Sequence, residues 1–105
     1  MKKLLLLLSA LLILSCGNSK PDESDAKEAA RSAIIRNLKN PLDVKFHHNE
    51  TISDLGDNTF EYRETFNATN SFGGSIKKNA TVKVKWLKDD PSEISNWSVL
   101  DIRFY

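Results

Sequence analysis

The chain contains one cysteine among its 105 residues, and this scarcity limits the kinds of fold it can adopt. A small exported domain stabilised by disulfides needs cysteines in pairs, so a lone Cys16 excludes a disulfide framework. Fifteen basic and fourteen acidic side chains leave almost no net charge. Because nucleic-acid binding requires a marked basic excess, we expect no nucleic-acid partner.

Long apolar runs are also missing, except at the beginning of the chain. Lys2 and Lys3 precede an apolar segment from Leu4 to Leu14, and this order is typical of a secretory signal. The segment is shorter than the roughly 20 residues of a membrane-spanning helix. We therefore expect residues 1–15 to be a signal peptide that is removed on export.

The apolar segment ends in Ile13-Leu14-Ser15-Cys16, which resembles the lipobox of bacterial lipoproteins. The resemblance implies cleavage before Cys16 and a diacylglycerol on its sulfur, and several acyl chains suffice for stable anchoring. The alternative is an ordinary signal peptide with an incidental cysteine. Because Gly17 follows the cysteine, the resemblance implies the outer membrane in a diderm cell, and otherwise the outer face of the cytoplasmic membrane. Polar residues 16–23 indicate a flexible tether.

Removal of residues 1–15 leaves 105 − 15 = 90 residues, which predicts a single domain over residues 24–105. Small apolar residues recur between Ala26 and Leu38 at the spacing of one helix face. Ser24 or Asp25 is expected to cap this helix, with Glu28 completing a capping box. A membrane-surface helix is the alternative, although its apolar face would carry bulkier side chains.

Downstream segments alternate with a period of two residues and predict four strands. The first, from Val44 to Ile52, is interrupted near His48; the others cover residues 59–68, 80–86 and 97–105. The sequence therefore predicts an α+β fold in which one N-terminal helix packs on a four-stranded antiparallel sheet. This arrangement resembles cystatin-like or NTF2-like folds, which host inhibitors, enzymes and interaction modules alike.

The stretch from Asn70 to Asn79 contains adjacent glycines and two lysines, so it could bind phosphate or form a turn. A phosphate-binding loop leads into a helix, whereas a strand pattern follows here. We therefore predict a hairpin with a three-residue loop, 72–74, and Gly74 in left-handed geometry. In this register Phe66 faces Ala80, Tyr62 faces Val84, Phe60 faces Trp86 and Glu61 faces Lys85.

Three segments of the chain together carry a second resemblance. The combination of Leu38-Lys39-Asn40-Pro41, Lys45-Phe46 and the later Asn70-Ser71-Phe72-Gly73-Gly74 resembles small bacterial lipoproteins with no assigned chemistry. The resemblance covers most of residues 28–88. It implies a helix followed by a hairpin and nothing about activity.

Glu64 is the one acidic residue on the predicted apolar face of its strand. A carboxylate among aromatic side chains could act as a general base or lie in a ligand pocket between helix and sheet. Alternatively, it is an inward charge that opposes edge pairing, or it marks where the helix stops covering the sheet. His47 and His48 point to opposite faces of a strand, so no metal site is expected.

The final strand carries apolar residues on both faces. Leu100, Ile102 and Phe104 form one row, which we expect to face the core. The other row is then exposed and could contact a partner protein; it contains Trp97, Val99, Asp101, Arg103 and Tyr105. Alternatively, strand twist buries parts of both rows.

These features favour a lipid-anchored envelope protein that is a non-catalytic interaction module with a protein partner and no cofactor. No catalytic constellation is recognisable in the sequence. One competing hypothesis is a small ligand-binding protein or enzyme that uses a helix–sheet pocket containing Glu64. Another, suggested by fold analogy, is a protease-inhibitor-like module.

Overall fold

The computed structural model describes residues 20–38, 43–70 and 72–105. The expected signal peptide and the lipidation site Cys16 lie outside these residues, as do residues 17–19 of the expected tether. Elements follow one another in the order α2 (Glu23–Arg36), β1 (Lys45–Phe46), β2 (Thr51–Gly56), β3 (Thr59–Thr69), β4 (Ser75–Trp86), η2 (Ile94–Asn96) and β5 (Trp97–Phe104).

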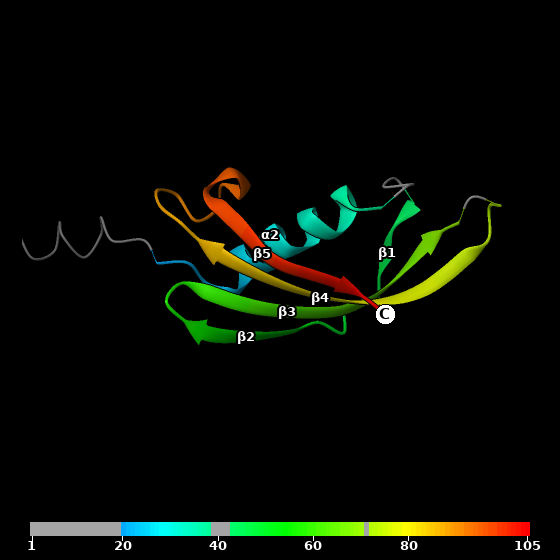
Figure 1. The fold of residues 1–105 in the computed structure, drawn as a ribbon, viewed down its shortest axis with the longest axis horizontal. Helices are drawn as coiled ribbons and strands as arrows, with labels where there is room; N and C mark the ends of the chain where they lie inside the picture. Colours follow the sequence, from blue (N-terminus) through cyan, green and yellow to red (C-terminus); the bar gives the residue numbers. More distant parts are fainter. Residues whose placement is uncertain (1–19, 39–42, 71) are drawn as a thin grey trace, which may run out of the picture.

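All five strands belong to one antiparallel sheet with the order β1-β3-β4-β5, and β2 also pairs with β3. Helix α2 lies across one face of this sheet (Figure 1). The predicted α+β fold is therefore confirmed. The sheet has five strands rather than four because the predicted first strand breaks at His48, which adopts a left-handed φ of 58°.

Helix α2 begins earlier than the sequence pattern indicated. Asp22 is the N-cap, and its carboxylate accepts a hydrogen bond from the backbone N–H of Asp25 at 2.8 Å. The Asp25 carboxylate in turn accepts from the backbone N–H of Asp22 at 3.1 Å. The expected cap at Ser24 or Asp25 is wrong because Asp22, with Asp25 three residues later, forms the reciprocal capping box first.

The core lies between α2 and the inner face of the sheet. The alanine face of the helix is buried as predicted, and so is Ile34. These small side chains let the helix lie close to the larger residues beneath it, and each fully buried aromatic or aliphatic side chain contributes about 1.5–3 kcal/mol. The largest fully buried side chains are Tyr62, Phe66, Ile34, Val82 and Val84.

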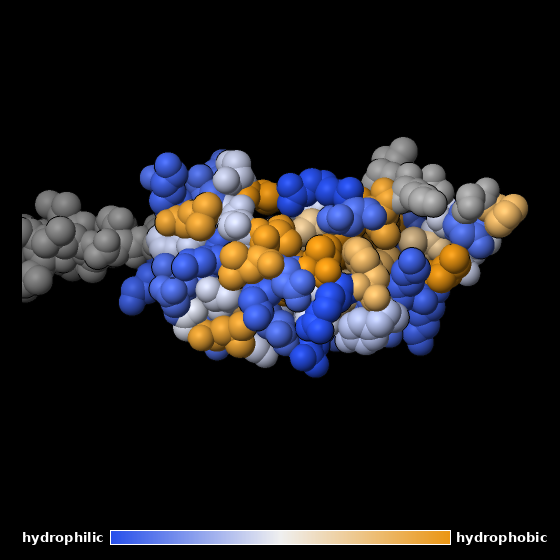
Figure 2. Space-filling view, viewed as in Figure 1, coloured by the Kyte–Doolittle hydropathy of each residue, from blue (hydrophilic) through white to orange (hydrophobic). Residues whose placement is uncertain are grey.

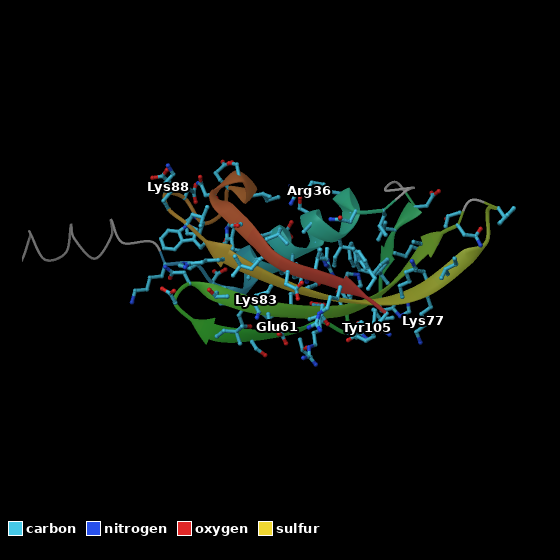
Figure 3. All side chains as sticks on the ribbon, in the orientation of Figure 1. Arg36, Glu61, Lys77, Lys83, Lys88 and Tyr105 are labelled. Carbon is cyan, nitrogen blue, oxygen red and sulfur yellow. The ribbon has the colours of Figure 1, made fainter. Side chains whose placement is uncertain are left out.

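The hairpin between β3 and β4 has a different register from the predicted one. Tyr62 faces Val82 and Glu61 faces Lys83, and the last pair before the loop is Thr69 with Ser75. Figure 3 shows Glu61 and Lys83 on these neighbouring strands. The predicted partners Val84 and Lys85 are therefore wrong by two residues, as are the pairs Phe66–Ala80 and Phe60–Trp86.

The loop of this hairpin is closed by an asparagine side chain. The Oδ1 atom of Asn70 accepts hydrogen bonds from the backbone N–H groups of Phe72 and Gly74, at 3.0 and 2.8 Å. Gly73 adopts the left-handed φ of 84°, so the expectation for Gly74 is wrong. Because the Asn70 side chain accepts hydrogen bonds from its own loop, the loop is stable although it is longer than the predicted three residues.

A β-bulge changes the faces of β5. Lys83 pairs with Asp101 but the next residue, Val84, pairs with Val99, so Leu100 is an extra residue. The bulge moves Trp97 and Val99 to the same side as Ile102. Trp97 is consequently only 8% exposed, and its ring lies 5.9 Å from that of Phe60.

Candidate functional site

The Glu64 carboxylate is the centre of a buried polar network between α2 and the sheet. Its side chain is 0% exposed. Arg31 donates to both of its oxygens, with Nε at 2.9 Å from Oε1 and Nη2 at 2.8 Å from Oε2. The Tyr62 hydroxyl donates to Oε1, and the backbone N–H of His48 donates to Oε2 at 2.9 Å.

The Arg31 guanidinium is the positive charge of this network. Burial alone would lower its pKa, but its hydrogen bonds to Glu64 and Tyr62 outweigh burial and raise the pKa of Arg31 above its ordinary value. The group also lies over the ring of Phe46, 4.4 Å from the ring centroid. Arg31 therefore stays charged and is held by both the helix and the strands.

Tyr62 contributes a neutral hydroxyl. Burial raises the pKa of Tyr62, and the neighbouring Glu64 carboxylate raises it further. Its oxygen also accepts a hydrogen bond from Nε of Arg31 at 3.0 Å. The phenol accordingly remains protonated and donates to Glu64 at neutral pH.

This arrangement leaves the Glu64 carboxylate fully occupied. A carboxylate offers about four acceptor positions, and four donors from Arg31, Tyr62 and His48 fill them. A general base needs a free acceptor directed at its substrate. The geometry therefore suits an internal ion pair that joins helix and sheet.

Cavities near the network are small or do not reach the carboxylate. A polar cavity of about 90 Å³ includes Glu64 in its lining. Its polar side chains form hydrogen bonds with one another: the Thr65 hydroxyl accepts from Asn49 at 2.9 Å and donates to Asn79 at 2.8 Å. A larger cavity of about 300 Å³ beside the helix is lined by Arg31 and Phe46 but not by Glu64.

Three potential metal ligands do converge, but a side chain already lies among them. Atoms of His48, Glu50 and Glu64 lie within 4.8 Å of one another. The Nη2 atom of Arg31 is 2.8 Å from Glu64, 3.4 Å from His48 Nδ1 and 3.8 Å from Glu50. The guanidinium thus supplies the positive charge that a cation would bring.

The two histidines follow β1 rather than lying within the predicted strand, and their side chains have different neighbours. His48 approaches Arg31, whereas His47 contacts the side chain of Asn67. A second ion pair extends the network at its edge, because Lys27 lies 2.9 Å from Glu50. This hydrogen bond lowers the pKa of Glu50.

Sequence reasoning identified Glu64 but missed its partner Arg31. The available signal was the helical spacing of Lys27 and Arg31, which are four residues apart and border the alanine face. Cations in that position face inward-pointing acids on the sheet beneath. Those acids are Glu64 on β3 and Glu50, which directly precedes β2.

The surface along β5 is the second notable feature. Leu100 is 52% exposed, Val99 38% and Tyr105 68%. Figure 2 shows hydrophobic side chains gathered over the region that β5 occupies in Figure 1. Trp97 was expected in this exposed row, but it is buried and its Nε1 donates to the carbonyl of Pro91 at 2.7 Å.

The charged residues of β5 lie on the opposite face from its apolar row. Asp101 and Arg103 form an ion pair at 3.2 Å, and both side chains are more than half exposed. Tyr105, labelled in Figure 3, lies at the end of the strand. In the part of the chain that the structure describes, β5 pairs only with β4.

The comparisons with known proteins add no family. No protein-family model, curated protein or solved structure matches the chain. Among the described residues, no helix is both long and apolar enough to span a membrane.

Proposed function

We propose that this protein is a lipid-anchored bacterial envelope protein whose domain is a non-catalytic interaction module. In this proposal Cys16 carries the lipid and the domain contacts a protein partner through β5. The anchoring membrane is the outer membrane in a diderm cell, and otherwise the cytoplasmic membrane, with the domain on its outer face.

The free edge of β5 is the observation that carries this proposal. The strand is eight residues long and pairs on one side only in the described chain. An exposed strand edge presents unpaired backbone groups, which other chains can bind by adding a strand. The exposed Val99 and Leu100 would add apolar contact area to such backbone pairing.

The competing hypothesis of an enzyme or ligand-binding protein has less support. It relied on Glu64 as a reactive or binding group, and that carboxylate already accepts hydrogen bonds from Arg31, Tyr62 and His48. The inhibitor hypothesis depends on fold analogy alone. No contact of the described residues favours it.

A photo-crosslinking amino acid tests the proposed surface in the native envelope. Placed at Leu100, it should yield an adduct of defined mass. A matched substitution at Ser53, exposed on β2, should yield none. Equal adducts from both positions, or none from Leu100, would refute a binding surface at β5.

The anchor is tested separately. Cys16→Ser should abolish incorporation of labelled fatty acid and release the exported domain from the membrane fraction. A variant that still incorporates the label would show that Cys16 is not the lipidated residue.

A further inference from the structure

The sequence at the end of β5 is self-complementary. Leu100-Asp101-Ile102-Arg103-Phe104 alternates apolar and charged residues around Ile102, with an acid on one side and a base on the other. If two copies lie antiparallel about Ile102, Asp101 of each faces Arg103 of the other. Pairing centred on Asp101 or on Arg103 would instead place like charges opposite each other, which is destabilising.

We propose that the partner of β5 is a second copy of this chain, joined edge to edge about a twofold axis at Ile102. The two five-stranded sheets would then form one continuous sheet. This inference rests on the proposed function, because it names the occupant of the same β5 surface. An isologous contact of this kind requires a self-complementary patch.

The backbone of β5 is oriented for this pairing. The N–H and C=O groups of Tyr105 bond to Asn79 of β4, at 3.0 and 2.9 Å. Backbone groups alternate between the two sides of an antiparallel strand, so those of Ile102 and Phe104 point to the free edge. Ile102 would therefore exchange both backbone hydrogen bonds with its own copy.

The side chains complement one another on both faces of the sheet. On the outer face, the Asp101–Arg103 pair of each copy would meet the reversed pair of the other, giving four alternating charges. On the inner face, the half-exposed Leu100 would meet Phe104 of the second copy. The bulge at Leu100 limits regular pairing to the residues that follow it.

The lipid anchor favours such a contact. A single strand pair buries little area, so we expect weak association in free solution. Two chains held in one membrane encounter each other at a much higher effective concentration. A weak edge contact is therefore sufficient on the membrane.

A cysteine at the axis tests the pairing directly. Cys16 is the only native cysteine and is lipid-modified in the proposed form. In the full chain in its native membrane, Ile102→Cys should give a disulfide-linked dimer under mild oxidation. The Cα atoms of such a pair lie about 5.5 Å apart, which suits a disulfide.

The matched control lies on the same strand. Ser98 is four residues from Ile102, so its two copies would lie about 27 Å apart in the proposed register, at roughly 3.4 Å per residue. Ser98→Cys should therefore form no dimer. A dimer from both cysteines would indicate parallel pairing or random collision and would overturn the proposal.

Charge exchange provides a second test that leaves the core intact. Asp101→Arg places four cations at the axis and should lower the yield of the Ile102→Cys dimer by about tenfold or more. The double exchange Asp101→Arg with Arg103→Asp restores opposite charges and should restore the yield. If the dimer yield of the double variant is as low as that of the single variant, the twofold pairing is refuted.

The outcomes separate this inference from the proposed function. If Ile102→Cys forms no dimer but the photo-crosslinker at Leu100 captures a different protein, the second copy is refuted and an interaction surface at β5 stands. If neither position forms an adduct, both proposals fall.

Discussion

Replacing Arg31 by methionine is the sharpest test of the network around Glu64. The change removes one donor from each carboxylate oxygen, and the Tyr62 hydroxyl and the backbone N–H of His48 remain as donors. Methionine keeps the apolar stem but lacks the guanidinium that lies over the ring of Phe46. The variant therefore removes the charge, its hydrogen bonds and this ring contact, while the helix keeps an apolar side chain at the position.

The expected cost follows from the burial of the pair. Removing one partner of a buried ion pair costs about 3–5 kcal/mol, because the other charge is left without compensation. The Glu64 side chain is 0% exposed and that of Arg31 is 17% exposed. Since water can reach the site on the Arg31 side, we expect a loss of about 3 kcal/mol, a large share of the roughly 5–15 kcal/mol that stabilises a small domain.

The free energy of unfolding is measured by urea denaturation of residues 20–105, followed by circular dichroism. Arg36→Met is the matched control, because Arg36 is exposed in the last turn of the same helix and its Nε donates to the Ser32 carbonyl at 3.3 Å. We expect this control to cost less than about 0.5 kcal/mol.

A double-mutant comparison decides whether the two residues act together. In a Glu64→Gln background, Arg31→Met leaves no unpaired carboxylate behind, so it should cost only about 1 kcal/mol. The reasoning is wrong if Arg31→Met costs the same in both backgrounds. It is also wrong if Arg31→Met lowers the free energy of unfolding no more than Arg36→Met does.

Three further predictions concern the edge of the network and the hairpin loop. Lys27 lowers the pKa of Glu50, so the pair stabilises the fold above the ordinary pKa of about 4.3 and loses this effect as pH falls through the lowered value. Glu50→Gln should thus destabilise the fold at pH 7, and its difference in stability from the wild type should shrink as the pH falls below about 4.3; a difference that does not change with pH would contradict this. Asn70→Ala removes the acceptor of two loop N–H groups and should lower the free energy of unfolding in urea by about 1 kcal/mol. An unchanged free energy of unfolding would show that the Asn70 side chain does not stabilise the loop. Gly73→Ala forces a side chain to a φ of 84° and should cost about 1–2 kcal/mol in the same measurement, whereas an unchanged midpoint would mean that the loop relaxes.

Strand alternation predicted the faces of the hairpin more reliably than its pairs. The observed register differs from the expected one by two residues, and such a shift leaves every side chain on its predicted face. Tyr62 and Val84 are therefore both buried although they do not face each other. The loop length depended on the Asn70 side chain, which strand periodicity does not reveal.

The last strand shows where alternation fails. One extra residue at Leu100 reverses the faces before it, so Trp97 joins the core and only the residues after the bulge follow the predicted rows. Nothing in the sequence WSVLDIRFY fixes the position of that residue. The bulge is set by pairing with β4, a tertiary contact.

The candidate site was half predictable. The two-residue alternation of the strand is enough to place Glu64 on the same face as Phe60, Tyr62 and Phe66. Its partner Arg31 depends on how α2 is rotated about its axis and where it crosses the sheet. Those quantities follow from packing of the whole domain rather than from the helix sequence.

The filled carboxylate also constrains how this protein can change over evolutionary time. Positions 31, 62 and 64 are expected to change together, because losing any single member removes a hydrogen-bond partner from each of the other two. Homologues should either keep all three or replace them together with apolar residues. Position 48 contributes its backbone N–H to Glu64 and only a longer ring contact of 3.4 Å to Arg31. Its side chain is therefore less constrained than those of the other three, as long as the new residue tolerates a left-handed φ.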